Sequence, residues 1–185
     1  LSSLDVINNY LISTLNCSDN QISTLSLRPL YMSKILSLNS LYCNNNQLTS
    51  IDLTAAIYLT KLKCQFNQLS SLDLGQKIGL DLVECHSNQL TSIDLTSANY
   101  LTRLLCYSNQ ITSLDMSNNN ALSYFNCSYN MLTSLDLRNG NNTSFSVFSS
   151  YGNPNLNCIN VDYSSWSSSH WFNKDPQHYF SENCP

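Results

Sequence analysis

A cysteine recurs every 21 residues through the middle of the chain, at Cys43, Cys64, Cys85, Cys106 and Cys127. Cys17 precedes this series by 26 residues, and the segment RPLYMSKILS holds the five extra residues. Self-similarity at a fixed period of this length is the signature of a repeat architecture, in which each unit contacts only its neighbours. The period therefore constrains the fold more strongly than any local pattern does.

Each period contains two related halves. The cysteine half reads L-x-x-L-x-C-x-x-N, as in residues 101–109, and the aspartate half reads L-T-S-L-D-L, as in residues 132–137. A degenerate cysteine half at 145–150 follows the last periodic cysteine. The apolar residues of a single unit have no partner within it, so we expect neighbouring units to stack and bury them together.

This pattern resembles the leucine-rich repeat family, specifically its short bacterial class, whose unit of about 21 residues carries two L-x-x-L-x-L segments. The resemblance implies a mainly β, right-handed solenoid of about seven coils, with parallel strands stacked at about 4.8 Å. We expect residues 1–161 to form this leucine-rich repeat solenoid and residues 162–185 to form a C-terminal cap packed on it, within a single domain.

Cys158 and Cys184 fall outside the period, and we expect them to form a disulfide that closes the cap. The tail resembles the caps of leucine-rich repeat segments in secreted Bacteroidetes proteins, with its N-P-N-L-x-C-I-x-V-D opening and its final F-S-x-N-C. Such a bridge implies an oxidising compartment, so we expect a secreted or cell-surface protein. Five aromatic residues are expected to close the core or, alternatively, to form a sugar platform: Trp166, Trp171, Phe172, Tyr179 and Phe180.

The periodic cysteines are expected to be buried, reduced thiols. Parallel side chains stacked at about 4.8 Å keep their Cβ atoms further apart than the roughly 3.8 Å that a disulfide prefers. A line of single thiols also does not converge on a metal ion as tetrahedral zinc ligands do, so we expect no metal or other cofactor. An asparagine follows each cysteine half and is expected to satisfy backbone groups at the turn, at positions 20, 46, 67, 88, 109, 130 and 153.

A column of aspartates recurs in the aspartate half, at Asp52, Asp73, Asp94, Asp115 and Asp136. Carboxylates at this spacing repel one another, and we expect neighbouring serine and threonine hydroxyls to donate to them. Bound Ca²⁺ is the alternative, but it takes about six to eight oxygen ligands, more than a flat row supplies. The rows of threonine and serine also resemble ice-binding solenoids, although the columns mix the two residues.

The outward positions of the cysteine half vary from coil to coil, whereas those of the aspartate half barely change. Mixed charge with exposed aromatic residues is typical of an interaction surface, and unconstrained drift is the alternative. The aromatic residues either leave apolar area for a partner or stack on one another. The candidate binding residues on this face are Tyr42, Lys61, Lys63, Phe66, Glu84, His86, Arg103, Leu105, Tyr107, Tyr124 and Tyr129.

We therefore predict a non-catalytic binding module that recognises a protein first and a glycan second, with a spacer or stalk in a larger secreted protein as the alternative. No catalytic motif is present, and His170, His178 and Asp175 are interpreted as cap residues. A net charge of -4 disfavours nucleic acid, and no apolar run is long enough for membrane insertion.

The chain begins inside a repeat and without methionine, so we expect a fragment of a mature protein. We expect a monomer or weak end-to-end self-association, because Leu1, Leu4 and Val6 start a half-coil with nothing stacked before it.

Overall fold

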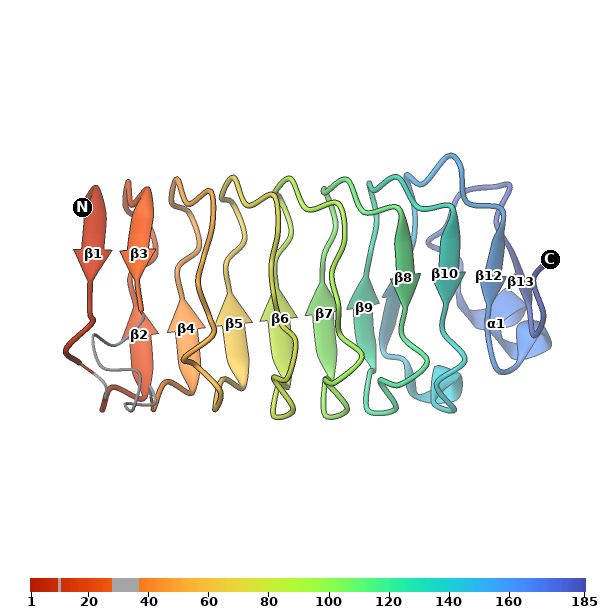
Figure 1. Cartoon of the computed structure of the whole chain (residues 1–185). Helices are drawn as coiled ribbons and strands as arrows, with labels where there is room; N and C mark the ends of the chain where they lie inside the picture. Colours follow the sequence, from red (N-terminus) through yellow and green to blue (C-terminus); the bar gives the residue numbers. More distant parts are fainter. Residues whose placement is uncertain (10, 28–36) are drawn as a thin grey trace.

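The computed structural model describes residues 1–9, 11–27 and 37–185. It confirms a mainly β solenoid of parallel strands, with about eight turns and little helix. The two termini lie at opposite ends of an elongated molecule (Figure 1). Nearly all of the segment predicted to hold the five extra residues of the first period, at 28–36, lies outside the described residues.

The cysteine halves form one seven-stranded parallel sheet, which we call the cysteine-half sheet. Equivalent positions of neighbouring coils are in register, so that Leu62 pairs with Val83 and Val83 pairs with Leu104. The paired residues are 26 positions apart between β2 and β4, 21 apart from β4 to β9, and 23 apart between β9 and β11, so each outward column continues along this sheet. Its strands are β2 (Thr14–Asn16), β4 (Ser40–Tyr42), β5 (Lys61–Lys63), β6 (Leu82–Glu84), β7 (Arg103–Leu105), β9 (Tyr124–Asn126) and β11 (Val147–Ser149).

The aspartate halves form two shorter parallel sheets, whose strands run opposite to the cysteine-half sheet in Figure 1. One pairs β1 (Ser3–Asp5) with β3 (Thr24–Ser26). Among the described residues, the equivalent segments 51–53, 72–74 and 93–95 form no strand. The other sheet contains β8 (Ser113–Asp115), β10 (Ser134–Asp136), β12 (Cys158–Asn160) and β13 (Tyr179–Ser181).

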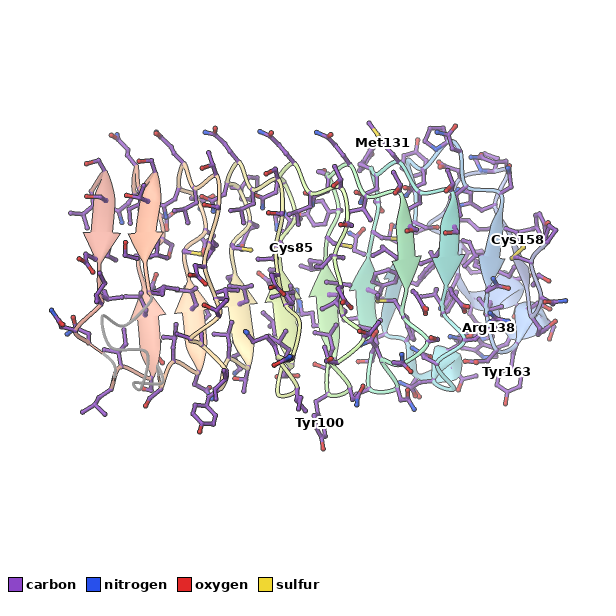
Figure 2. The ribbon with its side chains drawn as sticks, in the orientation of Figure 1. Cys85, Tyr100, Met131, Arg138, Cys158 and Tyr163 are labelled. Carbon is purple, nitrogen blue, oxygen red and sulfur yellow. A yellow bond between two sulfur atoms is a disulfide. The ribbon has the colours of Figure 1, made fainter. Side chains whose placement is uncertain are left out.

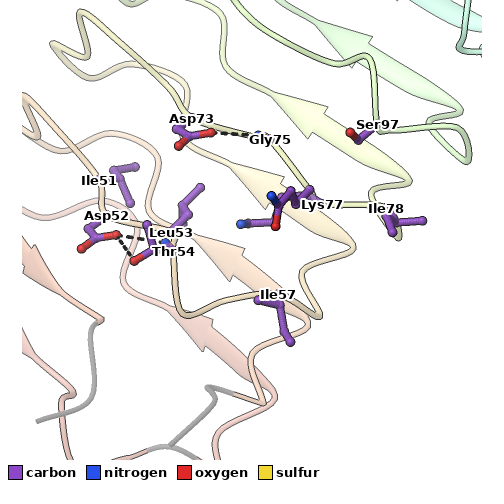
Figure 3. A pocket seen from close by; sticks show the side chains of 11 residues that line it. Ile51, Asp52, Leu53, Thr54, Ile57, Asp73, Gly75, Lys77, Ile78 and Ser97 are labelled. Atoms are coloured by element: carbon purple, nitrogen blue, oxygen red, sulfur yellow. Dashed lines mark hydrogen bonds between the residues drawn. The ribbon is translucent and has the colours of Figure 1, made fainter. Parts of the chain in front are cut away.

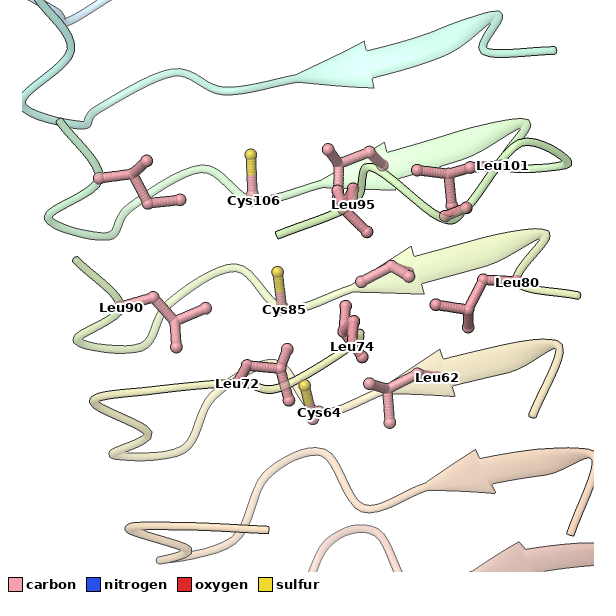
Figure 4. Close-up of a cluster of buried hydrophobic side chains, with 14 of the residues drawn as sticks. Leu62, Cys64, Leu72, Leu74, Leu80, Cys85, Leu90, Leu95, Leu101 and Cys106 are labelled. Carbon is pink, nitrogen blue, oxygen red and sulfur yellow. The ribbon is translucent and has the colours of Figure 1, made fainter. Parts of the chain in front are cut away.

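Rows of leucine and cysteine fill the space inside the coils, as Figure 4 shows for three adjacent turns. The six periodic cysteines are free and buried, as the sequence predicts. Burial raises the pKa of every one of these thiols, and it raises that of Cys85 to about 12. The thiols are therefore protonated, apolar components of the core at neutral pH.

The asparagine column forms the predicted ladder of hydrogen bonds. Asn109 Nδ2 donates to the carbonyl of Cys106 in its own coil at 3.0 Å and to that of Cys85 in the preceding coil at 3.2 Å. Its Oδ1 accepts from the Leu90 N–H at 2.9 Å. The asparagines at 46, 67, 88 and 130 repeat these three bonds, so each one joins two coils at the turn after the strand.

The C-terminal tail covers the last coil. The predicted disulfide between Cys158 and Cys184 is present, with Cα atoms 5.8 Å apart. Strand β13 adds to the edge of β12, and the helix α1 (Ser164–His170) contacts both β13 and the 3₁₀ turn η1 (Asn142–Ser144). Figure 2 shows Cys158 at this end of the molecule, where β12 begins.

Three of the five predicted cap aromatics cover the core. Trp171 stacks on Phe148 at 4.3 Å between ring centroids and contacts Phe180 at 5.6 Å, and both Trp171 and Phe180 are buried. Trp166 is half-buried and packs against this cluster. The prediction was wrong for Phe172 and Tyr179, which are 76% and 50% exposed. Phe172 follows the buried Trp171 and Tyr179 precedes the buried Phe180, so the neighbouring side chain already takes the inward position.

Asp175 and His178 hold the cap to the last coil. The carboxylate of Asp175 accepts from the N–H groups of Gly152 and Asn153 at 3.0 and 2.7 Å. His178 bridges the Ser150 hydroxyl and the Asn153 carbonyl at 3.2 and 3.1 Å. Burial lowers the pKa of His178, although its bond to Asn153 and the nearby Asp175 carboxylate oppose this. These contacts support the interpretation of both residues as part of the cap.

Candidate binding face

The outward side chains of the cysteine-half sheet, together with those of the turn that follows each strand, form what we call the variable face. Strand alternation positions them: Leu62 points into the core, whereas Lys61 and Lys63 on either side of it point outward. Because the strands are in register, equivalent outward residues of neighbouring coils touch. The face therefore consists of columns that run along the solenoid axis.

A charged cluster occupies the centre of this face. The Glu84 carboxylate lies 3.2 Å from Lys63 Nζ and 3.5 Å from Arg103 Nε, so two cations from the adjacent strands enclose one anion. The Arg103 guanidinium also lies over the Tyr124 ring, at 4.1 Å from its centroid. With Lys61 added, these strand positions carry three cations and one anion on a chain whose net charge is -4.

An aromatic row runs beside the charged cluster. The His86 ring stacks on Tyr107 with centroids 4.0 Å apart and meets Phe66 edge to face at 5.1 Å. The Tyr107 hydroxyl lies 3.2 Å from His86 Nε2. Burial lowers the pKa of His86, and the nearby Glu84 carboxylate opposes this effect. His86 is therefore a neutral component of the row at pH 7.

The structure places all the predicted binding residues on this face, but it corrects their exposure. Glu84, His86 and Leu105 were expected to be exposed, and all three are buried. The cause is the close spacing of the coils, which lets the side chains of Lys63 and Arg103 cover Glu84 and the rings of Phe66 and Tyr107 cover His86. The other candidates are at least partly accessible: Tyr42, Lys61, Lys63, Phe66, Arg103, Tyr107, Tyr124 and Tyr129.

The residue before each ladder asparagine has a left-handed backbone conformation. Its φ angle lies between 54° and 76° in every coil from Asp19 to Gly152. Most coils place aspartate, asparagine, serine or glycine there, which tolerate this conformation better than bulky residues do. Phe66 and Tyr129 are the two aromatic residues at this position, with φ of 56° and 54°. Such backbone strain, about 1–3 kcal/mol per residue, is commonly found at functional sites.

The position of the Tyr129 ring depends on the glycine in the next coil. A Cβ atom on Gly152 would lie 2.7 Å from Tyr129 Cδ1, closer than nonbonded atoms approach. Tyr129 also meets Tyr151 edge to face at 5.7 Å, and it remains 58% exposed. An aromatic residue at one turn and a glycine at the next therefore together present this ring to solvent.

A hollow of about 270 Å³ opens beside the Tyr129 ring. The hydroxyls of Ser128 and Ser149 lie 2.6 Å apart in it, and Asn126 Oδ1 accepts from the Ser128 N–H at 3.0 Å. Only Tyr107 and Tyr129 of its lining are among the candidates from sequence; four of the others are small polar residues, and Tyr151 follows the degenerate cysteine half. The hollow is lined by Tyr107, Asn126, Ser128, Tyr129, Ser149, Tyr151 and Asn173.

The aspartate column on the other half of the coil has a structural role. Asp94 Oδ1 accepts from both the N–H and the hydroxyl of Thr96, at 3.0 and 2.7 Å. These two bonds lower the pKa of Asp94. Asp73 accepts from the Gly75 N–H and Asp115 from the Ser117 N–H, so the backbone donor two residues later is common to the column, and a side-chain hydroxyl joins it only in some coils. The predicted hydroxyl donors are therefore only part of the arrangement.

A second hollow, of about 830 Å³, opens at the turns after Asp52 and Asp73 (Figure 3). Lys77 lines it from the column that Ala56 and Ala98 occupy in the neighbouring coils, and Lys77 is only 5% exposed. This hollow was not predicted from the sequence, because the outward positions of the aspartate half barely change from coil to coil. The available signal was the segment DLGQKIGL, whose two glycines replace a threonine and a tyrosine of the adjacent coils.

No known family model matches the chain, and no curated protein matches it either. Solved structures do match. The chain is similar to the functional domain of InlJ from Listeria monocytogenes, which is described as including a cysteine ladder, with 27% identity and a TM-score of 0.73. That alignment covers 97% of this chain and 41% of the InlJ chain.

Two further structures have the same fold. A leucine-rich repeat protein of Leptospira interrogans is 19% identical with a TM-score of 0.57, over 80% of this chain and 37% of its own. An internalin, InlF, from Listeria monocytogenes is 22% identical with a TM-score of 0.53, over 85% of this chain and 49% of its own. The fold is thus that of bacterial leucine-rich repeat proteins, and the chain spans less than half of each. None of the three comes from Bacteroidetes, so that resemblance remains a prediction.

Within the part of the chain that the structure describes, no helix has both the length and the apolar character needed to cross a membrane.

Proposed function

We propose that this chain is a non-catalytic recognition module of a secreted or surface-attached bacterial protein, and that it binds another protein through the variable face. One observation carries the proposal: cations and aromatic side chains gather on this face, whereas the L-T-S-L-D-L segments of the other half repeat threonine, serine and aspartate from coil to coil. Partly exposed tyrosines and arginines are the residue types that dominate binding energy at protein interfaces.

Two further observations support the proposal. The structural neighbours include an internalin and a domain of InlJ with a cysteine ladder, both from bacterial leucine-rich repeat proteins. The disulfide between Cys158 and Cys184 is of the kind that persists outside the cytosol. The excess of cations among the strand residues favours a partner with acidic groups, since complementary charge speeds association and excludes other partners.

A pull-down with the immobilised chain tests the proposal. The double variant Lys61→Glu with Tyr124→Ala changes two accessible residues of the variable face, and Thr91→Ala with Thr112→Ala is the matched control on the aspartate half. We expect the first variant to lose the captured protein and the control to retain it, with thermal unfolding unchanged in the control. Capture of no protein, or equal capture by both variants, would refute the proposal and favour a spacer.

A further inference from the structure

The hollow beside Tyr129 differs in chemistry from the rest of the variable face. Each of its seven lining side chains is neutral and carries a hydroxyl or an amide group. The cations and the buried Glu84 lie outside it, on the preceding strands. A charged ligand would therefore find no counter-ion in the hollow, and a purely apolar ligand would leave the hydroxyls without partners.

One side of the hollow is aromatic, and contacts between neighbouring coils fix the positions of its rings. Tyr129 takes a backbone conformation that bulky residues rarely adopt, and its ring occupies space that any side chain on Gly152 would fill. Tyr151 supports the ring edge to face, and Tyr107 is held by its stacking on His86. Three tyrosines from successive coils therefore present aromatic surface around one small volume.

The floor of the hollow supplies polar groups. Ser128 and Ser149 are buried, and their hydroxyls are bonded to each other at 2.6 Å. Asn126 uses its Oδ1 to accept from the Ser128 N–H, and among the described residues its Nδ2 makes no hydrogen bond. A ligand hydroxyl placed here has a free amide donor and hydroxyl acceptors within one site.

A neighbouring hollow extends this site toward the cap. Its volume is about 440 Å³, and it shares Asn173 with the first hollow. Its lining includes Trp166, which stacks on His170 at 4.1 Å, and the exposed ring of Phe172. Aromatic surface and small polar groups thus continue past the first hollow along the end of the molecule.

We propose that the hollow beside Tyr129 binds a neutral pyranose residue of a glycan, and that further sugar residues extend past Asn173 toward Phe172. The apolar C–H face of a pyranose packs on an aromatic ring, and its hydroxyls both donate and accept hydrogen bonds, which is the combination this lining offers. The volume of the hollow, about 270 Å³, is slightly below the roughly 300 Å³ of the smallest ordinary ligand pockets, and it suits a single sugar residue. The inference rests on the proposed function only in that both use the variable face.

Two substitutions of exposed tyrosines test this assignment. Tyr129→Asn removes the aromatic wall and places a residue that tolerates the left-handed conformation, so the variant should fold at least as well as the native chain. Tyr100→Asn makes the same change at another exposed tyrosine, which lies outside both the hollow and the variable face, and is the matched control. Neutral oligosaccharides of glucose, galactose, mannose and N-acetylglucosamine are the probes, with sialylated and sulfated glycans as the charged set, on an array and in NMR titrations.

We expect at least one neutral oligosaccharide to bind, with about tenfold or greater loss of affinity in Tyr129→Asn and little change in Tyr100→Asn. Binding of charged glycans alone, binding of no glycan, or equal losses in both variants would overturn the assignment. Loss of a captured protein in Tyr129→Asn without any sugar binding would overturn it too, and would assign the hollow to the protein partner. If the native chain binds a neutral oligosaccharide but captures no protein in the pull-down, the result supports this inference and refutes only the proposed function.

Discussion

Replacing Asn109 with alanine measures what one rung of the asparagine ladder contributes to stability. The buried amide makes bonds to two coils, through Nδ2 to the carbonyls of Cys85 and Cys106 and through Oδ1 from the N–H of Leu90. The coils join only through contacts with their neighbours, so a lost rung weakens the interface between two coils in the middle of the molecule.

The size of the expected loss of stability depends on which polar groups lose their last hydrogen-bond partner. The Cys85 carbonyl keeps the bond from Asn88 Nδ2 at 3.0 Å, and the Cys106 carbonyl keeps the bond from Asn130 Nδ2 at 3.0 Å. The N–H of Leu90 keeps none of its bonds, and a buried donor without a partner costs about 1–3 kcal/mol. The lost bonds to the Cys85 and Cys106 carbonyls contribute about 1 kcal/mol each. The longer bond to the Tyr107 carbonyl, at 3.4 Å, adds little, because this carbonyl keeps the bond from the Ser87 N–H at 3.0 Å. We therefore expect unfolding to become easier by about 3–5 kcal/mol.

Urea unfolding followed by circular dichroism tests this value. Gln110→Ala is the control, because the Gln110 side chain is exposed and its backbone N–H keeps its bond to the Leu90 carbonyl in the variant. For Asn109→Ala we expect the urea concentration at the midpoint of unfolding to fall. We expect the dependence of the unfolding free energy on urea concentration to stay the same, which indicates a change in stability alone. A difference between the two variants below about 0.5 kcal/mol would show that the ladder bonds do not hold the coils together.

Three other predictions concern Gly152, the six periodic thiols and His86. Gly152→Ala should lower the melting temperature more in the native background than in Tyr129→Asn, because only the native ring meets the added Cβ; equal shifts in a double-mutant cycle would contradict this. Native protein should leave the six periodic thiols unreacted with iodoacetamide, as counted by mass spectrometry, because burial raises their pKa values; labelling at the rate of unfolded protein would contradict it. Because burial lowers the His86 pKa, the native state binds fewer protons than the unfolded state, so stability measured by urea unfolding should fall as pH drops through about 6.5, and less so in His86→Gln. Identical pH profiles for the two proteins would refute the last prediction.

The repeat pattern determined the architecture because each coil meets a near copy of itself. A position that is apolar in every period has apolar neighbours on both sides, so the rows of leucine and cysteine could be placed in the core without coordinates. The same reasoning predicted the ladder role of residues such as Asn109 and the free thiols. Cys158 and Cys184 stood out because they break the period, and the structure joins them in a disulfide.

The tertiary structure decided what happens where coils differ, because an irregular residue is defined by the side chains above and below it. Glu84 is outward in the pattern, yet it is buried once Lys63 and Arg103 close over it. Gly152 reads as a turn residue, and only the position of the Tyr129 ring shows that it makes room for an exposed aromatic surface. Repetition alone specifies the average environment of a column, whereas a binding site depends on the packing of particular neighbours.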